Sequence, residues 1–405
     1  MLHQEDEEWV KETLVESERK KCISRVLQLD ADYAVAKGNN YVSDIYRLSL
    51  KLVNHSGEIE NRSLMYKIIP NVEDDTKLPE IRELHVFDNE IKMYSEVLPA
   101  MERLLLEKDP TAEPLWPRLV GFKRNYEGLL IEDISTQGYK MEDRTKGLDF
   151  EYICIALQAL ARFHALAAVL IERGELSTAD FDEYPFMKDM NKCREMAEKM
   201  SRDYRKTLES WKGEWSELSS GVVEFCDALP DRLWEVTRRD ESKFFTLNHG
   251  DYWVNNILFK KDPSGKPTTI KMIDFQLCFC NNPCLDVNYL ISSSLRPEYF
   301  DRKGELLKVY YNSLSKDLKL FDYKEIPTFD FIQESYKKTS VFGANIALAI
   351  RPYMTCAVAP FELKKEHPEF DVSELLYLVL QHGGDYVQRS TKAAIKQFKE
   401  QGLIK

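Results

Sequence analysis

One predicted β-hairpin constrains the fold of this chain more than any other feature. Residues 256–259 and 269–273 have the apolar composition of short strands, and residues 262–265 contain the proline and glycine of a turn. Asn256 begins the first strand and Asp274 follows the second. Because hairpin strands are antiparallel, we expect both side chains at the same end. Two converging oxygen donors suit Mg²⁺, which fills its other positions with phosphate and water.

A polar loop precedes this hairpin. It contains His249 and Asp251, and four residues separate Asp251 from Asn256. Protein kinases have the same spacing between the aspartate and the asparagine of their catalytic loop. At such a site Asp251 would hold a substrate hydroxyl and accept its proton, while Asn256 and Asp274 would bind the metal ion. A His-Gly-Asp triplet alone is common in turns, so the prediction depends on the triplet, the asparagine and the hairpin occurring together.

The chain divides into a β-rich part, residues 1–134, and a mainly helical part, residues 135–405. Residues 46–52 alternate apolar and polar side chains, as a half-buried strand does. In the same part we expect strands at 63–69, 118–123 and 128–132 and helices at Glu7–Leu29 and 87–98. In the second part, Asp149 to Glu172 reads as a long helix. The pattern predicts an α+β chain with two lobes: a small antiparallel sheet, then a larger helical lobe that carries the hairpin.

The composition excludes some partners and locations. The chain has 68 acidic and 56 basic residues and a net charge of −12, which disfavours binding to nucleic acid. Its most apolar stretch, residues 341–360, is interrupted by polar residues and proline, which indicates a buried helix rather than a membrane span. The acidic N-terminus does not resemble a secretory signal, so the eight cysteines indicate reduced thiols in the cytoplasm. Cys278, Cys280 and Cys284 are interpreted as buried thiols.

Five segments of the chain match, in order, those of one group of enzymes. They are residues 87–94, 130–134, 160–165, 249–256 and 273–276. Together they resemble the superfamily of aminoglycoside phosphotransferases and choline kinases and, within it, the ecdysteroid kinase-like family. The resemblance covers roughly residues 30–360. Gln276 stands where protein kinases have glycine, which favours the small-molecule branch.

The resemblance implies that Lys67 contacts the α- and β-phosphates of ATP. Glu90, on the following helix, would pair with Lys67 and fix its ammonium group. Glu83 and Glu96 are the alternative partners. Asp286 resembles a family aspartate that braces the catalytic loop.

The resemblance also implies two backbone elements that bind ATP. The hinge, whose backbone groups would read the edge of the adenine, would be formed by Glu132, Asp133 and Ile134. A loop at residues 38–43, which ends at Ser43, would lie over the phosphates. This loop departs from the family pattern because it contains a single glycine.

The resemblance implies a bilobal protein-kinase-like fold that binds ATP and Mg²⁺ between its lobes and phosphorylates a hydroxyl group of a small molecule, such as an ecdysteroid. Other interpretations stay open. A choline or aminoglycoside kinase would differ in its substrate, and choline would require acidic and aromatic residues around its cation. A protein kinase is disfavoured because the chain has no Ala-Pro-Glu after Asp274. A catalytically inactive binding protein would retain the fold without turnover.

Overall fold

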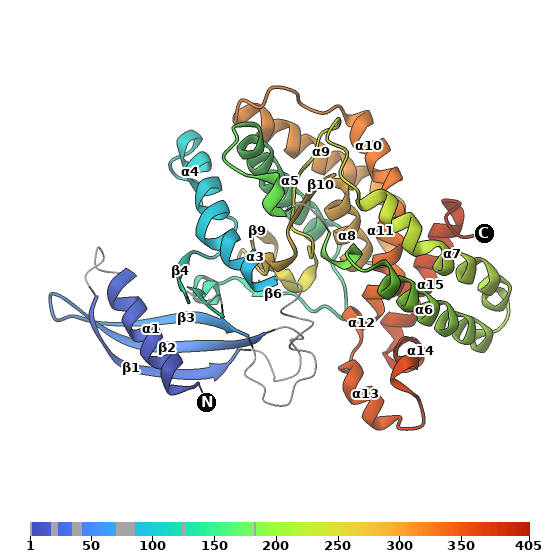
Figure 1. Ribbon diagram of the computed structural model, residues 1–405, viewed down its shortest axis with the longest axis horizontal. Helices are drawn as coiled ribbons and strands as arrows, with labels where there is room; N and C mark the ends of the chain where they lie inside the picture. Colours follow the sequence, from blue (N-terminus) through green and yellow to red (C-terminus); the bar gives the residue numbers. More distant parts are fainter. Residues whose placement is uncertain (1, 18–22, 35–42, 70–85, 124–126, 182–183) are drawn as a thin grey trace.

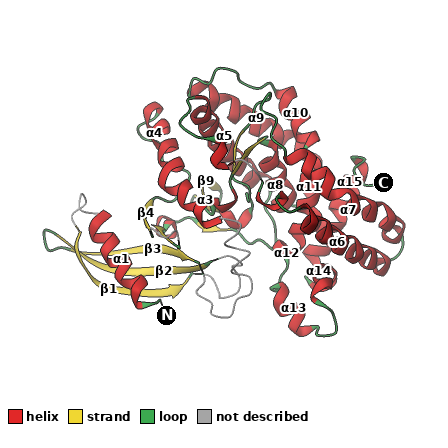
Figure 2. Cartoon of the chain, viewed as in Figure 1, coloured by secondary structure: helices red, strands yellow, loops and turns green. Residues whose placement is uncertain are grey.

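The computed structural model describes residues 2–17, 23–34, 43–69, 86–123, 127–181 and 184–405. The chain forms two lobes (Figure 1). A sheet, a helix packed on one of its faces and a helical segment at residues 86–108 make the smaller N-terminal lobe, and helices dominate the larger C-terminal lobe (Figure 2). The predicted bilobal, kinase-like α+β fold is confirmed.

The N-terminal lobe contains a five-stranded antiparallel sheet with the strand order β1-β2-β3-β5-β4. Its strands are β1 (Ile23–Tyr33), β2 (Asp44–Asn54), β3 (Ile59–Ile68), β4 (Leu119–Phe122) and β5 (Gly128–Glu132). Strands β2 to β5 lie where the sequence predicted them. The alternation along β2 buries Leu48 and Leu52 on one face of the sheet. Helix α1 (Gln4–Ser17) packs on this face through Val10 and Leu14, which belong to the same apolar cluster.

The predicted helix at Glu7–Leu29 is wrong in its second half. Helix α1 ends at Ser17, and residues 23–29 belong to strand β1, which pairs with β2 along its length. Ile23 and Val26 are three positions apart, which is a helical spacing. They pack in the same apolar cluster because β1 has register shifts between Ile23 and Arg25 and between Val26 and Gln28. Pairing with β2 satisfies the backbone of the segment and decides its conformation.

The predicted helix at residues 87–98 is longer and less regular than expected. It consists of α3 (Val86–Lys92), a π-helical turn η1 (Met93–Val97) and α4 (Leu98–Lys108). Pro99 lies in the first turn of α4. Because proline has no backbone N–H, it cannot donate to the preceding turn, and a π-turn accommodates the missing hydrogen bond. The pattern of apolar residues carried no signal of this irregularity.

Helix α5 (Phe150–Glu172) runs through the core of the C-terminal lobe, as predicted, and the side chain of Asp149 caps its first turn. The expectation that residues 341–360 are the most apolar stretch and form one buried helix is wrong, since this segment is divided into short helical elements. Among the described residues α5 is the helix that is long and apolar enough to cross a membrane, but 78% of its most apolar window is buried inside the protein, which is typical of a core helix. The other helices of this lobe are α6 (Met190–Trp211), α7 (Glu214–Thr237), α8 (Cys284–Ser294), α9 (Lys303–Leu320), α10 (Phe329–Lys338), α11 (Ser340–Asn345), the π-turn η8 (Ile346–Ile350), α12 (Arg351–Thr355), α13 (Pro360–Glu366), α14 (Leu375–His382) and α15 (Asp385–Glu400).

The predicted hairpin is present in the C-terminal lobe. Its strands are β8 (Ile257–Lys261) and β9 (Pro267–Met272), and β6 (Lys140–Met141) pairs with β8 as a third strand. Asn256 ends the short 3-10 turn η5 (Val254–Asn256) that precedes β8. A second pair of strands was not predicted. Strand β7 (Thr246–Asn248) precedes the hairpin in the chain, strand β10 (Phe279–Asn281) follows it, and the two strands pair with each other. The β7–β10 pairing closes the loop that holds Asp251.

The largest apolar cluster of the protein joins the two lobes. Phe87, Met93 and Met101 of the α3–α4 helix lie in the same buried cluster as Phe163 of α5 and Phe275, which follows the hairpin. Helix α3 is thereby packed against the segment that contains Asp274. This packing positions one carboxylate of α3, Glu90, close to the hairpin end.

Candidate active site

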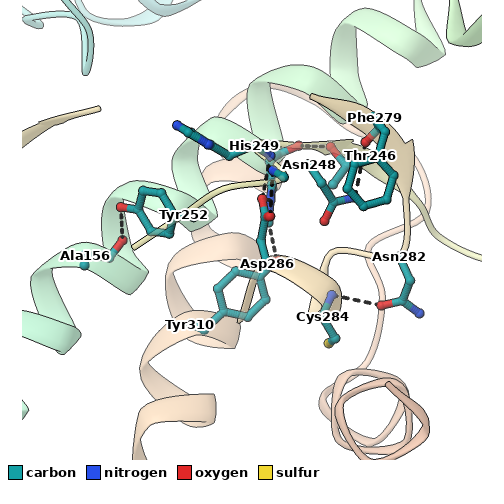
Figure 3. Close-up of polar contacts among 12 residues, drawn as sticks. Ala156, Thr246, Asn248, His249, Tyr252, Phe279, Asn282, Cys284, Asp286 and Tyr310 are labelled. Carbon is teal, nitrogen blue, oxygen red and sulfur yellow. Dashed lines mark hydrogen bonds and ion pairs between the residues drawn. The ribbon is translucent and has the colours of Figure 1, made fainter. Parts of the chain in front are cut away.

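Asp286 on α8 contacts the loop at His249 (Figure 3), and this loop also contains Asp251. Oδ2 of Asp286 accepts a hydrogen bond from the backbone N–H of His249 at 2.6 Å, and its Oδ1 accepts one from the N–H of Gly250 at 3.0 Å. Nε2 of His164 lies 3.1 Å from the same Oδ2. The carboxylate is buried, so these contacts satisfy a charge that would otherwise be costly. The predicted brace of the loop by Asp286 is confirmed.

His249 connects the loop to the end of the hairpin. Its Nε2 donates a hydrogen bond to the carbonyl oxygen of Ile273 at 3.1 Å, and its ring packs against Phe275 with 4.9 Å between ring centroids. Burial lowers the pKa of His249, although Asp286 and Asp274 oppose this, so the neutral ring is favoured. These contacts agree with a role in organising the loop rather than in proton transfer.

Gly250 is required by the backbone of this loop. Its φ is 82°, and a Cβ there would lie 1.9 Å from the carbonyl oxygen of Leu277. We expect Gly250→Ala to lower the free energy of unfolding by at least about 2 kcal/mol, measured by urea denaturation, because it adds a clash to an unfavourable φ. Gly265→Ala is the control, since Gly265 has a φ of 87° and no atom within 4 Å of a Cβ. Equal losses in both variants would exclude the contact with Leu277 as the cause.

Asp251 is held by donors on both of its carboxylate oxygens. Oδ2 accepts a hydrogen bond from Nδ2 of Asn256 at 2.8 Å, and Oδ1 accepts one from the hydroxyl of Tyr289 at 2.5 Å. Burial and, to a smaller extent, the nearby Asp274 raise the pKa of Asp251 to about 6, against hydrogen bonds from Tyr289, Asn256 and Trp253, which lower it. A carboxylate with this pKa is well suited to accept a proton near neutral pH.

Sequence reasoning missed Tyr289. It lies on α8, three residues after Asp286, and therefore on the same face of that helix. This spacing is the signal that could have identified it. If Asp286 contacts the backbone of the loop, Tyr289 on the same helix face is directed toward the same side.

Asn256 and Asp274 lie next to each other, as the hairpin predicted. The backbone N–H of Ile273 donates to the carbonyl oxygen of Asn256 at 3.1 Å, and Ile257 pairs with Met272 in the sheet. Asp274 has a φ of 68°, which is uncommon for a residue other than glycine and is found more often at functional sites. Its side chain is 26% exposed and remains accessible to a ligand. One carboxylate and one amide oxygen fit Mg²⁺, which takes few protein ligands when phosphate completes its shell.

Lys67 on β3 links the two lobes through a pair of carboxylates. Its Nζ lies 2.6 Å from Oε2 of Glu90 on α3 and 2.5 Å from Oδ1 of Asp274. Burial alone would lower the pKa of Lys67, but Asp274 and Glu90 raise it above its usual value, so the ammonium stays charged. The predicted ion pair between Lys67 and Glu90 is therefore present. The contact with Asp274 was not predicted.

For the phosphate transfer that the sequence predicts, we expect Lys67→Ala to lower the rate by at least about tenfold, because a charged hydrogen bond to phosphate contributes on the order of 2 kcal/mol. The substitution should damage turnover more than folding. The melting temperature should change little, since Glu90 can take up a proton when its cationic partner is removed. The control is Lys51→Ala, which removes an exposed lysine of β2. A wild-type rate in the Lys67 variant would remove this residue from the site.

The predicted hinge lies between β5 and the 3-10 turn η2 (Ile134–Gln137). The side chain of Asp133 has structural partners: it accepts hydrogen bonds from Ser63 at 2.6 Å and from Arg47 at 3.1 Å. The N–H of Glu132 donates to the carbonyl oxygen of Arg118. Side-chain contacts thus fix the shape of the hinge, and binding of a base would use its remaining backbone groups.

A small apolar cluster lies between the hinge and the hairpin. Ile134, Tyr139 and Leu258 form it, and Ile273 packs against it. Leu258 follows Asn256 by two residues and Ile273 directly precedes Asp274, so the cluster adjoins the polar site. Sequence reasoning did not identify this surface, because its members come from three separate segments. It is well placed to contact the apolar faces of a nucleotide base.

Three further sequence predictions concern less informative positions. Ser43 is buried directly before β2, while the rest of its loop, residues 38–42, lies outside the described residues. The alternative lysine partner Glu83 also lies outside them. The predicted buried thiols are confirmed, since Cys278, Cys280 and Cys284 are buried and are not part of a disulfide bond.

The fold and these contacts define a two-lobed protein of the kinase-like class. The sequence profile of the ecdysteroid kinase-like family matches residues 37–323 of the chain. The protein therefore belongs to the ecdysteroid kinase-like family. No curated protein matches the chain.

Proposed function

We propose that this protein transfers the γ-phosphate of ATP to a hydroxyl group of a small molecule and requires Mg²⁺ to do so. One observation carries the proposal: Lys67 contacts Asp274, Asn256 contacts Asp251, and a backbone hydrogen bond from Ile273 to Asn256 places these two pairs side by side where the lobes meet. Each of these side chains has the chemistry of one part of a phosphoryl-transfer site. Membership of a kinase-like family supports the same class of reaction.

The residues would divide the reaction as follows. Lys67, oriented by Glu90, would contact the α- and β-phosphates. Asn256 and Asp274 would hold Mg²⁺, which neutralises charge on the transferring phosphate. Asp251 would orient the acceptor hydroxyl and take its proton as the new phosphorus–oxygen bond forms and the bond to ADP breaks. Positioning and electrostatics would supply most of the catalysis.

The proposed acceptor is an ecdysteroid or a related hydroxylated compound, which is the class indicated by the family name. The proposed ligands otherwise include neither nucleic acid, given the net charge of −12, nor a membrane. We place the protein in the cytoplasm, where ATP is abundant and free cysteines stay reduced.

The test is a screen of acceptors with the purified protein, ATP and Mg²⁺. Ecdysone, choline and kanamycin represent the three substrate classes under consideration. Mass spectrometry would detect the gain of one phosphate, and Asp251→Asn protein is the negative control. Transfer to ecdysone supports the proposal, whereas transfer to choline or kanamycin alone assigns the protein to the alternative kinases. ATP binding without transfer or hydrolysis favours an inactive binding protein.

A further inference from the structure

The contact between Tyr289 and Asp251 is not explained by the proposed chemistry so far. Tyr289 lies on α8 and is 5% exposed, and its hydroxyl is 2.5 Å from Oδ1 of Asp251. Burial raises the pKa of Tyr289 well above its usual value, and the Asp251 carboxylate adds to this. The phenol therefore keeps its proton and donates it to Asp251 in the hydrogen bond.

The orientation of the Asp251 carboxylate depends on its hydrogen-bond donors. The terminal torsion of an aspartate is soft and has no sharply preferred angle. Asn256 donates to Oδ2, Tyr289 donates to Oδ1 at 2.5 Å, and the side chain of Trp253 is a third donor. Without Tyr289 the carboxylate would keep Asn256 and Trp253 but lose its short contact at Oδ1, so its plane would be set less firmly. A misplacement of about 1 Å can reduce a rate on the order of 10²-fold.

Tyr289 itself is held firmly. Its ring packs against Phe342 with 6.2 Å between centroids, and Phe342 in turn packs against Tyr184 at 5.4 Å. The helix that carries Tyr289 also carries Asp286, which binds the backbone of the Asp251 loop. One helix thus fixes both the loop backbone, through Asp286, and the catalytic side chain, through Tyr289.

We propose that Tyr289 is a positioning residue that orients the Asp251 carboxylate toward the acceptor hydroxyl. This inference rests on the proposed phosphotransferase function. It assigns to the Tyr289 hydroxyl no contact with ATP or Mg²⁺. Loss of the hydroxyl should therefore reduce kcat and leave the binding of MgATP unchanged.

The experiment compares Tyr289→Phe with Tyr184→Phe. Both changes remove one phenolic oxygen from the same buried cluster. Of these two hydroxyls, that of Tyr289 donates a hydrogen bond to Asp251 and that of Tyr184 is not among its donors in the described residues. Transfer to ecdysone is measured or, if ecdysone is not phosphorylated, hydrolysis of MgATP. We expect kcat of Tyr289→Phe to fall on the order of 10- to 100-fold, with KM for ATP changed less than about twofold. Tyr184→Phe should retain the wild-type kcat.

A double-mutant cycle separates positioning from a general structural role. If Tyr289 acts through the Asp251 carboxylate, adding Tyr289→Phe to Asp251→Ala, which removes the group that Tyr289 positions, should change the remaining rate by less than about twofold. Multiplication of the two single effects would overturn the proposal, as would a wild-type kcat in Tyr289→Phe. A wild-type protein that neither transfers phosphate nor hydrolyses ATP would overturn the proposed function as well. The two failures are therefore distinguishable by the activity of the wild type.

Discussion

Asp274→Ala is expected to remove most of the magnesium-dependent binding of ATP. Asp274 supplies the carboxylate of the Asn256–Asp274 pair, and a single amide oxygen holds Mg²⁺ poorly. We expect the affinity for ATP in the presence of Mg²⁺ to fall at least about 10²-fold, since loss of an outer-shell partner alone costs 10- to 100-fold. Lys67 retains its contact with Glu90 in this variant, so the folded state should persist.

The measurement is a calorimetric titration with ATP, with Mg²⁺ present or chelated. Wild-type protein should lose affinity on chelation, while the Asp274 variant should be nearly insensitive to it. Asp301→Ala, which removes an exposed carboxylate of the same lobe, should behave as wild type. Equal affinities with and without Mg²⁺ in both wild type and the Asp274 variant would show that Asn256 and Asp274 do not form a Mg²⁺ site.

Sequence reasoning succeeded where the functional residues are close in the chain. A hairpin turn of known chemistry lies between Asn256 and Asp274, so local geometry alone predicts their proximity. The spacing of Asp251 and Asn256 is likewise local. The alternation in β2 and the apolar periodicity of α5 are long and regular enough to indicate their structure directly.

Sequence reasoning failed where the local structure depends on contacts between segments that are far apart in the chain. Lys67 and Asp274 are 207 positions apart, and nothing in the pattern of either segment indicates their contact. Residues 23–29 became a strand because β2 lies beside them. Tyr289 is intermediate: its spacing from Asp286 on one helix face was visible, but only the packing of α8 against the loop shows that it reaches Asp251.

The ion pair between Lys67 and Asp274 would have to rearrange when Mg²⁺ and ATP bind. The same carboxylate that contacts Lys67 is the proposed ligand of Mg²⁺. Phosphate oxygens entering with the metal would give Lys67 new anionic partners and share the charge of Asp274 with the metal. Glu90 keeps Lys67 in place during this exchange, because its contact at 2.6 Å does not involve the metal site. The ammonium group would thus be oriented before the proposed binding of ATP.

Asp251→Asn is expected to lower the rate of phosphate transfer by a factor on the order of 10² or more, the usual scale for loss of a general base. The substitution is nearly isosteric. The oxygen of the new amide can accept the hydrogen bond from Asn256, and its nitrogen can donate to the hydroxyl oxygen of Tyr289, so the packing should survive. The amide cannot take the proton of the acceptor. Phosphoryl transfer generally passes through a loose transition state, in which the acceptor would lose its proton late, so much of the loss should come from poorer orientation of the hydroxyl.

Three measurements on the Asp251→Asn protein test this expectation together. The melting temperature and the affinity for MgATP should match those of the wild type, while transfer to a confirmed acceptor should collapse. Asp301→Asn provides the control for a lost carboxylate at an exposed position. If the Asp251 variant turned over the acceptor at the wild-type rate, Asp251 would not be the catalytic residue. The proposal for Tyr289, which acts only through Asp251, would fall with it, whereas the metal site at Asn256 and Asp274 would still stand on its own test.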